Sequence, residues 1–286
     1  MKTTLDCIPC FVRQALEAAR MVSDDPTVHE RIVREVLHWS SGMDLNQSPP
    51  VLAQRIHRRL REITGSTDPY LEAKARLNRM AMDLLPDLKA EIKSAPDPLA
   101  MAVRLAIAGN VIDLGAHGSV TEADVRRAVQ QALEEPFSGN WDEFSQAVAQ
   151  ARSILYLADN AGEIVFDRLL IEQFSPERVT LAVRGAPVIN DATLADARVA
   201  GLHEVVDIID NGSDAPGTIL EDCSPEFRLR FAAADMIIAK GQGNFETLSH
   251  VPGNIFFLFK AKCSVIANHV GLPLGTHVLA RFHPRR

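Results

Sequence analysis

The hydrophobic pattern of the chain changes near residue 151, and this change constrains the fold more than any other feature of the sequence. Before it, apolar residues recur every three or four positions, as at Leu52, Ile56 and Leu60, and Gly or Pro separates one run from the next. Such spacing places apolar side chains on one face of a helix. Residues 1–150 are therefore predicted to form a helical domain. Its last predicted helices cover residues 100–112, 121–133 and 141–151.

After residue 151, short apolar runs of strand length alternate with helical segments. The predicted strands are 153–158, 178–183, 204–209, 235–239, 254–258 and 264–267. The predicted helices between them are 164–173, 192–200, 225–233 and 245–250. Alternating strands and helices form right-handed crossovers, which produce a mostly parallel sheet with helices on both faces. Residues 151–286 are thus predicted to be an α/β domain.

The size and charge of the chain exclude several classes of protein. Its 286 residues suggest one or two domains at about 150 residues each. The net charge of −7, without a basic stripe, argues against nucleic acid as the partner and is compatible with a small phosphorylated molecule. No apolar run approaches the ~20 residues of a membrane span, and the N-terminus lacks the pattern of a secretory signal. Four cysteines do not make a disulfide scaffold, so a cytoplasmic protein is expected, and its oligomeric state stays open.

Polar, glycine-containing loops follow four of the predicted strands. They cover residues 159–163, 184–191, 210–214 and 240–244. In an open parallel sheet, ligands bind beyond the carboxyl ends of the strands, and those ends share one edge. Ordinary turns also use Gly, Asn and Asp. Four such loops at one edge nevertheless favour a binding site there.

Three side chains in these loops carry oxygen ligands: Asp159, Asn160 and Asp191. Carboxylate and amide oxygens suit Mg²⁺ or Mn²⁺. Both aspartates also precede helical segments, so each could instead cap a helix. An adjacent Asp–Asn pair is more than one cap needs, and the sequence therefore favours a metal site.

The loop that begins at Lys240 has the features of an anion site. Gly241 and Gly243 let backbone N–H groups approach an anion, and the helix that follows Asn244 presents its positive end there. A strand-to-helix turn with a solvated lysine is the alternative. Arg184, at the end of the second predicted strand, could clamp a phosphate with two hydrogen bonds or form a surface ion pair.

Two polar features of the helical half need an explanation. Cys7 and Cys10 open a helix away from any strand, where a redox motif is not expected, so they are predicted to be buried structural thiols. Asn110 and Asp113 lie near the end of an otherwise apolar helix. They either cap that helix or face the binding edge and contact the substrate.

Several stretches of the sequence match the motifs of one known family. They are 159–167 (DNAGEIVFD), 184–193 (RGAPVINDAT) and 240–246 (KGQGNFE), together with the opening LDCIPC. In combination they resemble the metal-dependent damage-control phosphatase family, or domain of unknown function 89, in its archaeal and bacterial branch. The resemblance runs from residue 5 to about residue 275. It implies a helical part that covers the active-site cleft of a Rossmann-like three-layer α/β/α core.

The resemblance also implies roles for particular residues. Asp159, Asn160 and Asp191 match positions that hold a divalent cation (Mg²⁺, Mn²⁺, Co²⁺ or Ni²⁺), and Lys240 with the loop after it matches the element that holds phosphate. The expected activity is hydrolysis of small phosphorylated metabolites such as sugar phosphates. The attacking group is either a water activated by the cation or Asp159 itself. Asp159 and Lys240 are therefore the predicted catalytic residues.

Two other functions stay open on the sequence alone. An S-adenosylmethionine-dependent carboxyl methyltransferase would share the α/β sheet, but it normally carries a Gly-rich loop where Asp159 and Asn160 stand. A non-catalytic module that binds phosphorylated metabolites would use Lys240 without turnover. Phosphate release that stops on chelation distinguishes hydrolysis from both.

Overall fold

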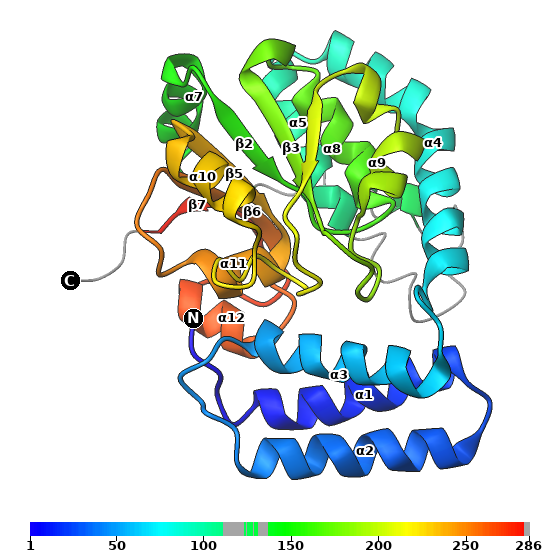
Figure 1. Cartoon of the computed structure of the whole chain (residues 1–286). Helices are drawn as coiled ribbons and strands as arrows, with labels where there is room; N and C mark the ends of the chain where they lie inside the picture. Colours follow the sequence, from blue (N-terminus) through cyan, green and yellow to red (C-terminus); the bar gives the residue numbers. More distant parts are fainter. Residues whose placement is uncertain (111–122, 124, 128, 131–136, 283–286) are drawn as a thin grey trace.

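The computed structural model describes residues 1–110, 123, 125–127, 129–130 and 137–282. A helical bundle forms one end of the molecule, and an α/β part forms the other (Figure 1). The bundle consists of α1 (Cys7–Val22), α2 (Pro26–Ser41) and α3 (Pro49–Thr64). None of the helices in this described part of the chain is both long and apolar enough to cross a bilayer.

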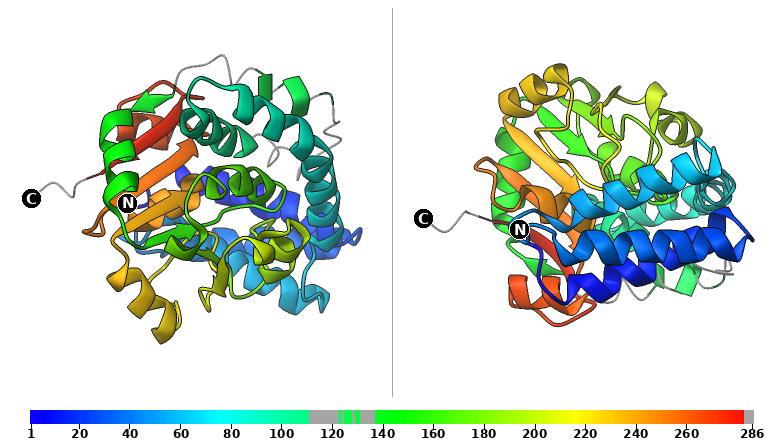
Figure 2. Two further views of the ribbon diagram at one scale, coloured as in Figure 1. Left: turned by 90° about the horizontal axis from the view of Figure 1, so that it is seen from above. Right: turned by 60° about the horizontal axis from the view of Figure 1, so that its bottom comes forward.

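The bundle helices lie side by side (Figure 2, right) because their apolar faces share one core. Phe11, Ile32 and Leu60 contribute to that core, one from each helix. Proline stands at the start of α2 and α3, where no backbone N–H is needed, and Gly65 ends α3 in the left-handed conformation. Local chemistry thus defines where these helices begin and end.

The α/β part is built on a seven-stranded sheet with the order β1-β7-β6-β5-β2-β3-β4. Its strands are β1 (Ser138–Gly139), β2 (Ile154–Leu157), β3 (Val179–Val183), β4 (Asp207–Asp210), β5 (Met236–Lys240), β6 (Ile255–Lys260) and β7 (His277–Arg281). Neighbouring strands are parallel except β6 and β7. The two neighbours of β2 are β3 and β5, which lead to opposite edges of the sheet. Such a reversal creates a crevice for ligands beyond the carboxyl ends of the strands.

Helices cover both faces of this sheet. One face carries α4 (Leu71–Ser94), α5 (Pro98–Ala108), α7 (Trp141–Gln150), α8 (Glu163–Ile171) and α9 (Leu194–Val199). The other carries α10 (Pro225–Ala233), α11 (Gly241–Leu248) and α12 (Ser264–Val270). The fold is therefore the predicted one, a Rossmann-like three-layer α/β/α core with a mostly parallel sheet.

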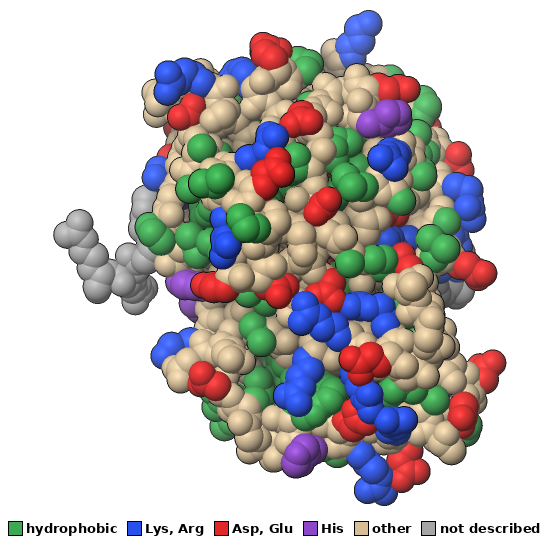
Figure 3. Space-filling view, in the orientation of Figure 1, with side chains coloured by type: hydrophobic (Ala, Val, Ile, Leu, Met, Phe, Trp, Pro, Cys, Tyr) green, Lys and Arg blue, Asp and Glu red, His purple; other side chains and the backbone are tan. Residues whose placement is uncertain are grey.

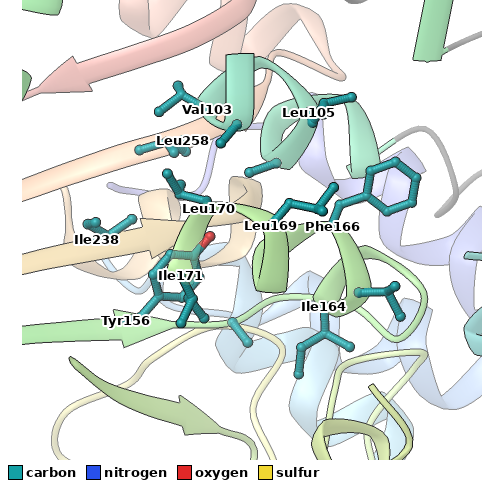
Figure 4. Close-up of a cluster of buried hydrophobic side chains, with 14 of the residues drawn as sticks. Val103, Leu105, Tyr156, Ile164, Phe166, Leu169, Leu170, Ile171, Ile238 and Leu258 are labelled. Carbon is teal, nitrogen blue, oxygen red and sulfur yellow. The ribbon is translucent and has the colours of Figure 1, made fainter. Parts of the chain in front are cut away.

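Successive side chains of β2 point to opposite faces of the sheet, which explains why a layer of helices packs on each face. Ile154 and Tyr156 pack into the core on one face, whereas Leu155 and Leu157 pack into the core on the other. Figure 4 shows the first of these cores, in which side chains of α5 and α8 meet those of the strands. A strand buried on both faces is apolar at every position, as this one is.

The C-terminal end of the sheet differs from the prediction. Residues 264–267, predicted as a strand, belong to α12, and the sixth long strand is β7, which pairs antiparallel with β6. A short apolar run fits a helix or a strand equally well. Here Gly271, in the left-handed conformation, ends the segment as a helix. The two-residue strand β1 was also not predicted.

The predicted domain boundary at residue 150 remains a prediction. One hydrophobic core joins residues on both sides of it, since Leu77 of α4 and Phe144 of α7 pack with the sheet. The bundle of α1–α3, in contrast, has a core of its own.

Hydrogen bonds to a charged side chain connect the bundle to the α/β part. Asp214, in the segment after β4, accepts hydrogen bonds from Gln54 (2.7 Å to Oδ1), Arg58 (2.9 Å, Nε to Oδ1) and Arg61 of α3. Basic and acidic side chains meet along the seam between the two parts in Figure 3. The hydrogen bonds to Asp214 set how α3 lies over the carboxyl end of the sheet.

Candidate functional site

A pocket of about 640 Å³ lies between the bundle and the carboxyl ends of the central strands. We call it the central pocket. Its walls come from α1, α3, the segments after β2, β3, β4 and β6, α11 and the start of α12. It thus occupies the crevice where the strand order reverses, which is the expected place for a ligand.

Asp159, Asn160 and Asp191 all line the central pocket. Backbone hydrogen bonds hold the two loops together, from Ala161 N to Asn190 O (2.8 Å) and from Ala192 N to Asp159 O (2.8 Å). The amide of Asn160 also donates to Oδ2 of Asp159 (2.9 Å). The structure therefore brings together the three side chains that were predicted to bind metal.

The loop that carries Asp191 contains a strained residue. Ile189 has a φ of 44°, in the left-handed region that β-branched residues avoid. Its side chain packs against the bundle core, and it lines the central pocket. Strain of this kind costs about 1–3 kcal/mol and is concentrated at functional sites.

The guanidinium of Arg184 contacts the carboxylates of Asp191 and Asp159 and does not face the central pocket. Its Nε donates to Oδ2 of Asp191 (2.6 Å), and its Nη2 lies 3.7 Å from Oδ1 of Asp159. The side chain is 2% exposed and does not line the central pocket. Arg184 therefore does not reach the pocket in this structure, and the phosphate clamp expected of it stays a prediction.

The glycine-containing loop differs from its predicted form, because α11 already begins at Gly241. Gly243 lines the central pocket, and Gly241 packs directly on the carboxylate of Asp159. Asn244 is buried and donates to the backbone oxygens of Lys240 (2.7 Å) and Ala158 (3.2 Å). Asn244 therefore ties the end of β5 to the end of β2 and does not reach the pocket.

Lys240 is fully buried and does not line the central pocket. Its ammonium group donates to Glu163 Oε1 (2.7 Å), Asp167 Oδ1 (2.6 Å) and the backbone oxygen of Ala106 (2.8 Å). Three acceptors use all of its protons in this structure, and the phosphate contact expected of this group stays a prediction.

Asn110 belongs to the same buried cluster as Lys240. It donates from Nδ2 to both oxygens of Glu163 (3.1 and 3.0 Å) and does not line the central pocket. Asp113 lies outside the described residues, so its predicted contact with substrate stays a prediction.

The carboxylates at the pocket repel each other. Burial raises the pKa of Asp159 well above its usual value, and repulsion from Glu163 and Asp191 adds to the rise. The positive charges of Arg184 and Lys262 act in the opposite direction. A cation bound between these carboxylates would relieve the repulsion.

The charge count of the site fits a divalent cation. Its buried ionisable groups are the carboxylates Asp159, Asp191, Glu163 and Asp167 and the cations Arg184 and Lys240. Four carboxylates against two cations leave two negative charges when all are ionised. The pocket donors are two carboxylates and one amide, which suits a cation that keeps waters and substrate oxygens as further ligands. Within the described ranges, no three His, Cys, Asp or Glu side chains converge on a ready-made metal cluster.

Lys262 and Glu246 are among the ionisable pocket residues to which the sequence motifs assigned no role. Lys262 follows β6, so the rule that located the other loops at strand ends also applies to it. Glu246 lies on α11, and burial raises its carboxyl pKa to about 7. Its Oε1 accepts a hydrogen bond from Nε2 of Gln242 (2.8 Å), another residue of the pocket wall. Glu246 is the last residue of the motif 240–246, but that pattern did not indicate that its side chain faces the site.

The prediction of buried structural thiols is wrong for Cys7 and Cys10. Both are half-buried, free and part of the pocket lining, together with Cys263. Burial raises the pKa of the Cys10 thiol above its usual value. The two thiols face the pocket because α1 lies directly across it from α11 and α12.

A family model described as the damage-control phosphatase ARMT1-like domain matches residues 3–278. The chain belongs to this family. The resemblance carried by the three motifs is therefore confirmed, and it covers nearly the whole chain.

Relatives of this damage-control phosphatase domain occur in archaea. The chain is 37% identical to the damage-control phosphatase of Archaeoglobus fulgidus, over 97% of this chain and 98% of the relative. It is 34% identical to the damage-control phosphatase PH1575 of Pyrococcus horikoshii, over 98% of this chain and 98% of the relative. It is also 34% identical to the uncharacterized protein MJ0202 of Methanocaldococcus jannaschii, over 98% of this chain and 96% of the relative.

A solved structure supports the same assignment. The crystal structure of PH1575, named there a DUF89 family protein, superposes with a TM-score of 0.90 at 34% identity, over 99% of this chain and 100% of that one. The family and the names of these relatives support a phosphatase role for the chain.

Proposed function

We propose that the chain is a divalent-metal-dependent phosphatase that hydrolyses small phosphorylated metabolites such as sugar phosphates. One observation carries the proposal: Asp159, Asn160 and Asp191 share the wall of the central pocket with the cation Lys262. Oxygen donors for a metal and a positive charge for a phosphate group thereby meet in one cavity. The relatives named damage-control phosphatases support the same reaction.

Asp159, Asn160 and Asp191 would hold the cation. When bound, a divalent cation would neutralise negative charge on the phosphate and make the phosphorus more electrophilic. Arg184 keeps the carboxylate of Asp191 in place through its 2.6 Å hydrogen bond. Whether a water molecule or Asp159 attacks the phosphorus stays open. Trapping a phosphorylated peptide that contains Asp159 would show that Asp159 is the attacking group.

The lining of the central pocket favours a small anionic substrate. Arg13 of α1 and Lys262 both line it, and together with a cation bound by Asp159 and Asp191 they would attract a phosphate ester into this confined cavity. A volume of about 640 Å³ accommodates a metabolite but not a folded macromolecule. The part of the substrate away from its phosphate would contact the bundle residues of α1 and α3.

A phosphate-release screen tests the proposal. The chain is stripped with a chelator and then incubated with sugar phosphates and other small phosphate esters, with Mg²⁺, Mn²⁺, Co²⁺ or Ni²⁺. Release of phosphate that needs added metal supports the proposal. Binding without release would favour a non-catalytic module, and metal-independent methyl transfer from labelled S-adenosylmethionine would favour a methyltransferase.

A further inference from the structure

A cluster of buried polar side chains lies beneath the central pocket, between α5, α8 and β5. Its members are Asn110, Tyr156, Glu163, Asp167 and Lys240, and none is more than 1% exposed. Tyr156 donates from its hydroxyl to Oδ1 of Asp167 (2.8 Å), and in Figure 4 its ring extends from β2 toward α8. Apolar side chains surround the cluster, and a buried polar group without partners costs free energy.

A path of side-chain hydrogen bonds leads from this cluster to the pocket. Lys240 donates to Oε1 of Glu163 (2.7 Å), and Oε2 of Glu163 accepts from Nδ2 of Asn160 (3.2 Å). The same amide nitrogen donates to Oδ2 of Asp159 (2.9 Å). Both amide protons of Asn160 are therefore used by carboxylates.

We infer that Lys240 and Glu163 are positioning residues, which orient the amide of Asn160 so that its oxygen faces the cation site. This inference rests on the proposed function. Because the nitrogen of the amide is held by Glu163 and Asp159, its oxygen lies on the side away from Glu163. Lys240 acts through Glu163 and touches neither the cation nor the substrate.

The charge of Lys240 is needed for this role. Glu163 is 0% exposed and accepts hydrogen bonds from Asn110, Asn160 and Lys240. Lys240 is the cation in contact with that carboxylate. Without it, a buried negative charge would have only amide partners, which is a strongly unfavourable arrangement.

The matched variants are Glu163→Gln, Lys240→Met and Lys74→Met. The E163Q side chain keeps the shape of the glutamate, but only one of its two terminal atoms is an oxygen. Because Lys240 and Asn160 donate to different oxygens of Glu163, the variant can accept from one of them but not from both. K240M removes the cation. Lys74 is also buried, at 2% exposure, but it pairs with Asp68 and Asp196 and does not line the pocket, so K74M controls for loss of a buried lysine.

The measured quantity is the dissociation constant for Mn²⁺ of the chelator-treated protein, followed by electron paramagnetic resonance. Groups that orient a metal ligand change affinity by about 10–100-fold when removed. We expect a rise of that size in E163Q and K240M and less than threefold in K74M. At saturating Mn²⁺, kcat should fall in E163Q and K240M while KM stays within about threefold, because neither residue touches the substrate.

The opposite pattern would overturn the inference. Unchanged Mn²⁺ affinity with a large rise in KM in K240M would mean that Lys240 contacts phosphate directly. If K240M does not fold, the Mn²⁺ affinity of E163Q decides the question, and an unchanged value rejects the positioning role. If the parent chain binds Mn²⁺ but releases no phosphate from any ester, the proposed function fails, and the affinities still decide the positioning role.

Discussion

Gly241 lies so close to Asp159 that a β-carbon at position 241 would be 1.8 Å from Oδ2 of the aspartate. Its φ of 76° is also in the left-handed region that favours glycine. The start of α11 therefore packs against the carboxylate, and the ends of β2 and β5 form one unit. This contact explains why a glycine follows Lys240.

Replacement of Gly241 by alanine is expected to disable the site. The added methyl group would displace the carboxylate of Asp159, and a shift of about 1 Å at a catalytic group can cost ~100-fold in rate. Gly271→Ala is the matched control: Gly271 has a φ of 71°, and no atom lies within 4 Å of its missing β-carbon. In urea denaturation, G271A should lose about 1 kcal/mol of unfolding free energy from its left-handed backbone, and G241A should lose more because its methyl group also displaces Asp159. Only G241A should also lose Mn²⁺ binding, and equal activity in the two variants would contradict this view of the contact.

The predicted metal ligands should be needed for activity but not for folding. Asp159→Asn and Asp191→Asn keep the size of each side chain, and each should lower phosphate release by about 100-fold or more, because a catalytic cation supplies several kcal/mol. Asparagine is chosen at position 191 because alanine would leave the buried Arg184 without its 2.6 Å partner. The exposed Asp207→Asn should behave like the parent chain. Near-normal turnover in either site variant would show that the ligand assignment is wrong.

The sequence predicts some parts of this site well and others not at all, for physical reasons. Asp159, Asn160 and Asp191 follow strands of a parallel sheet, and topology alone brings such positions together. The buried positions of Arg184 and Lys240 depend on how side chains pair across the core, which no local pattern encodes. Cys7 and Cys10 face Glu246 and Cys263 across the pocket because of how the bundle docks on the sheet. The error at 264–267 has a different origin, since a short apolar run does not distinguish a helix from a strand.

Substrate binding should weaken as the pH rises through 7. Burial raises the pKa of Glu246 to about 7, although the hydrogen bond from Gln242 and the nearby amino group of Met1 lower it. Below that pH the carboxyl is neutral, and above it a negative charge in the pocket repels a phosphate ester. A repulsion of roughly 1 kcal/mol corresponds to a rise in KM of about fivefold between pH 6 and 8. Glu246→Gln should remove this rise when it is measured over the same pH series, and an identical pH profile in both proteins would refute the assignment.

Alkylation of the pocket thiols should block the site. Cys7, Cys10 and Cys263 line the pocket, whereas Cys223 is buried and burial raises its pKa to about 12. Because the thiolate is the reactive form and the pKa of Cys10 is raised, labelling by iodoacetamide should be slow at pH 7 and faster at pH 9. Peptide mapping should find label on the pocket thiols before Cys223, together with loss of activity. Full activity after their complete labelling would contradict the placement of the pocket.

The need for one bound cation is best examined by titrating the chelator-treated protein with Mn²⁺, with bound Mn²⁺ and phosphate release from a sugar phosphate measured in the same samples. Phosphate release should rise in proportion to Mn²⁺ occupancy and level off at one cation per chain, and Asp191→Asn should shift both curves together to higher Mn²⁺ concentrations. Phosphate release at full rate without bound cation, or Mn²⁺ binding that Asp191→Asn leaves unchanged, would contradict this need for a cation.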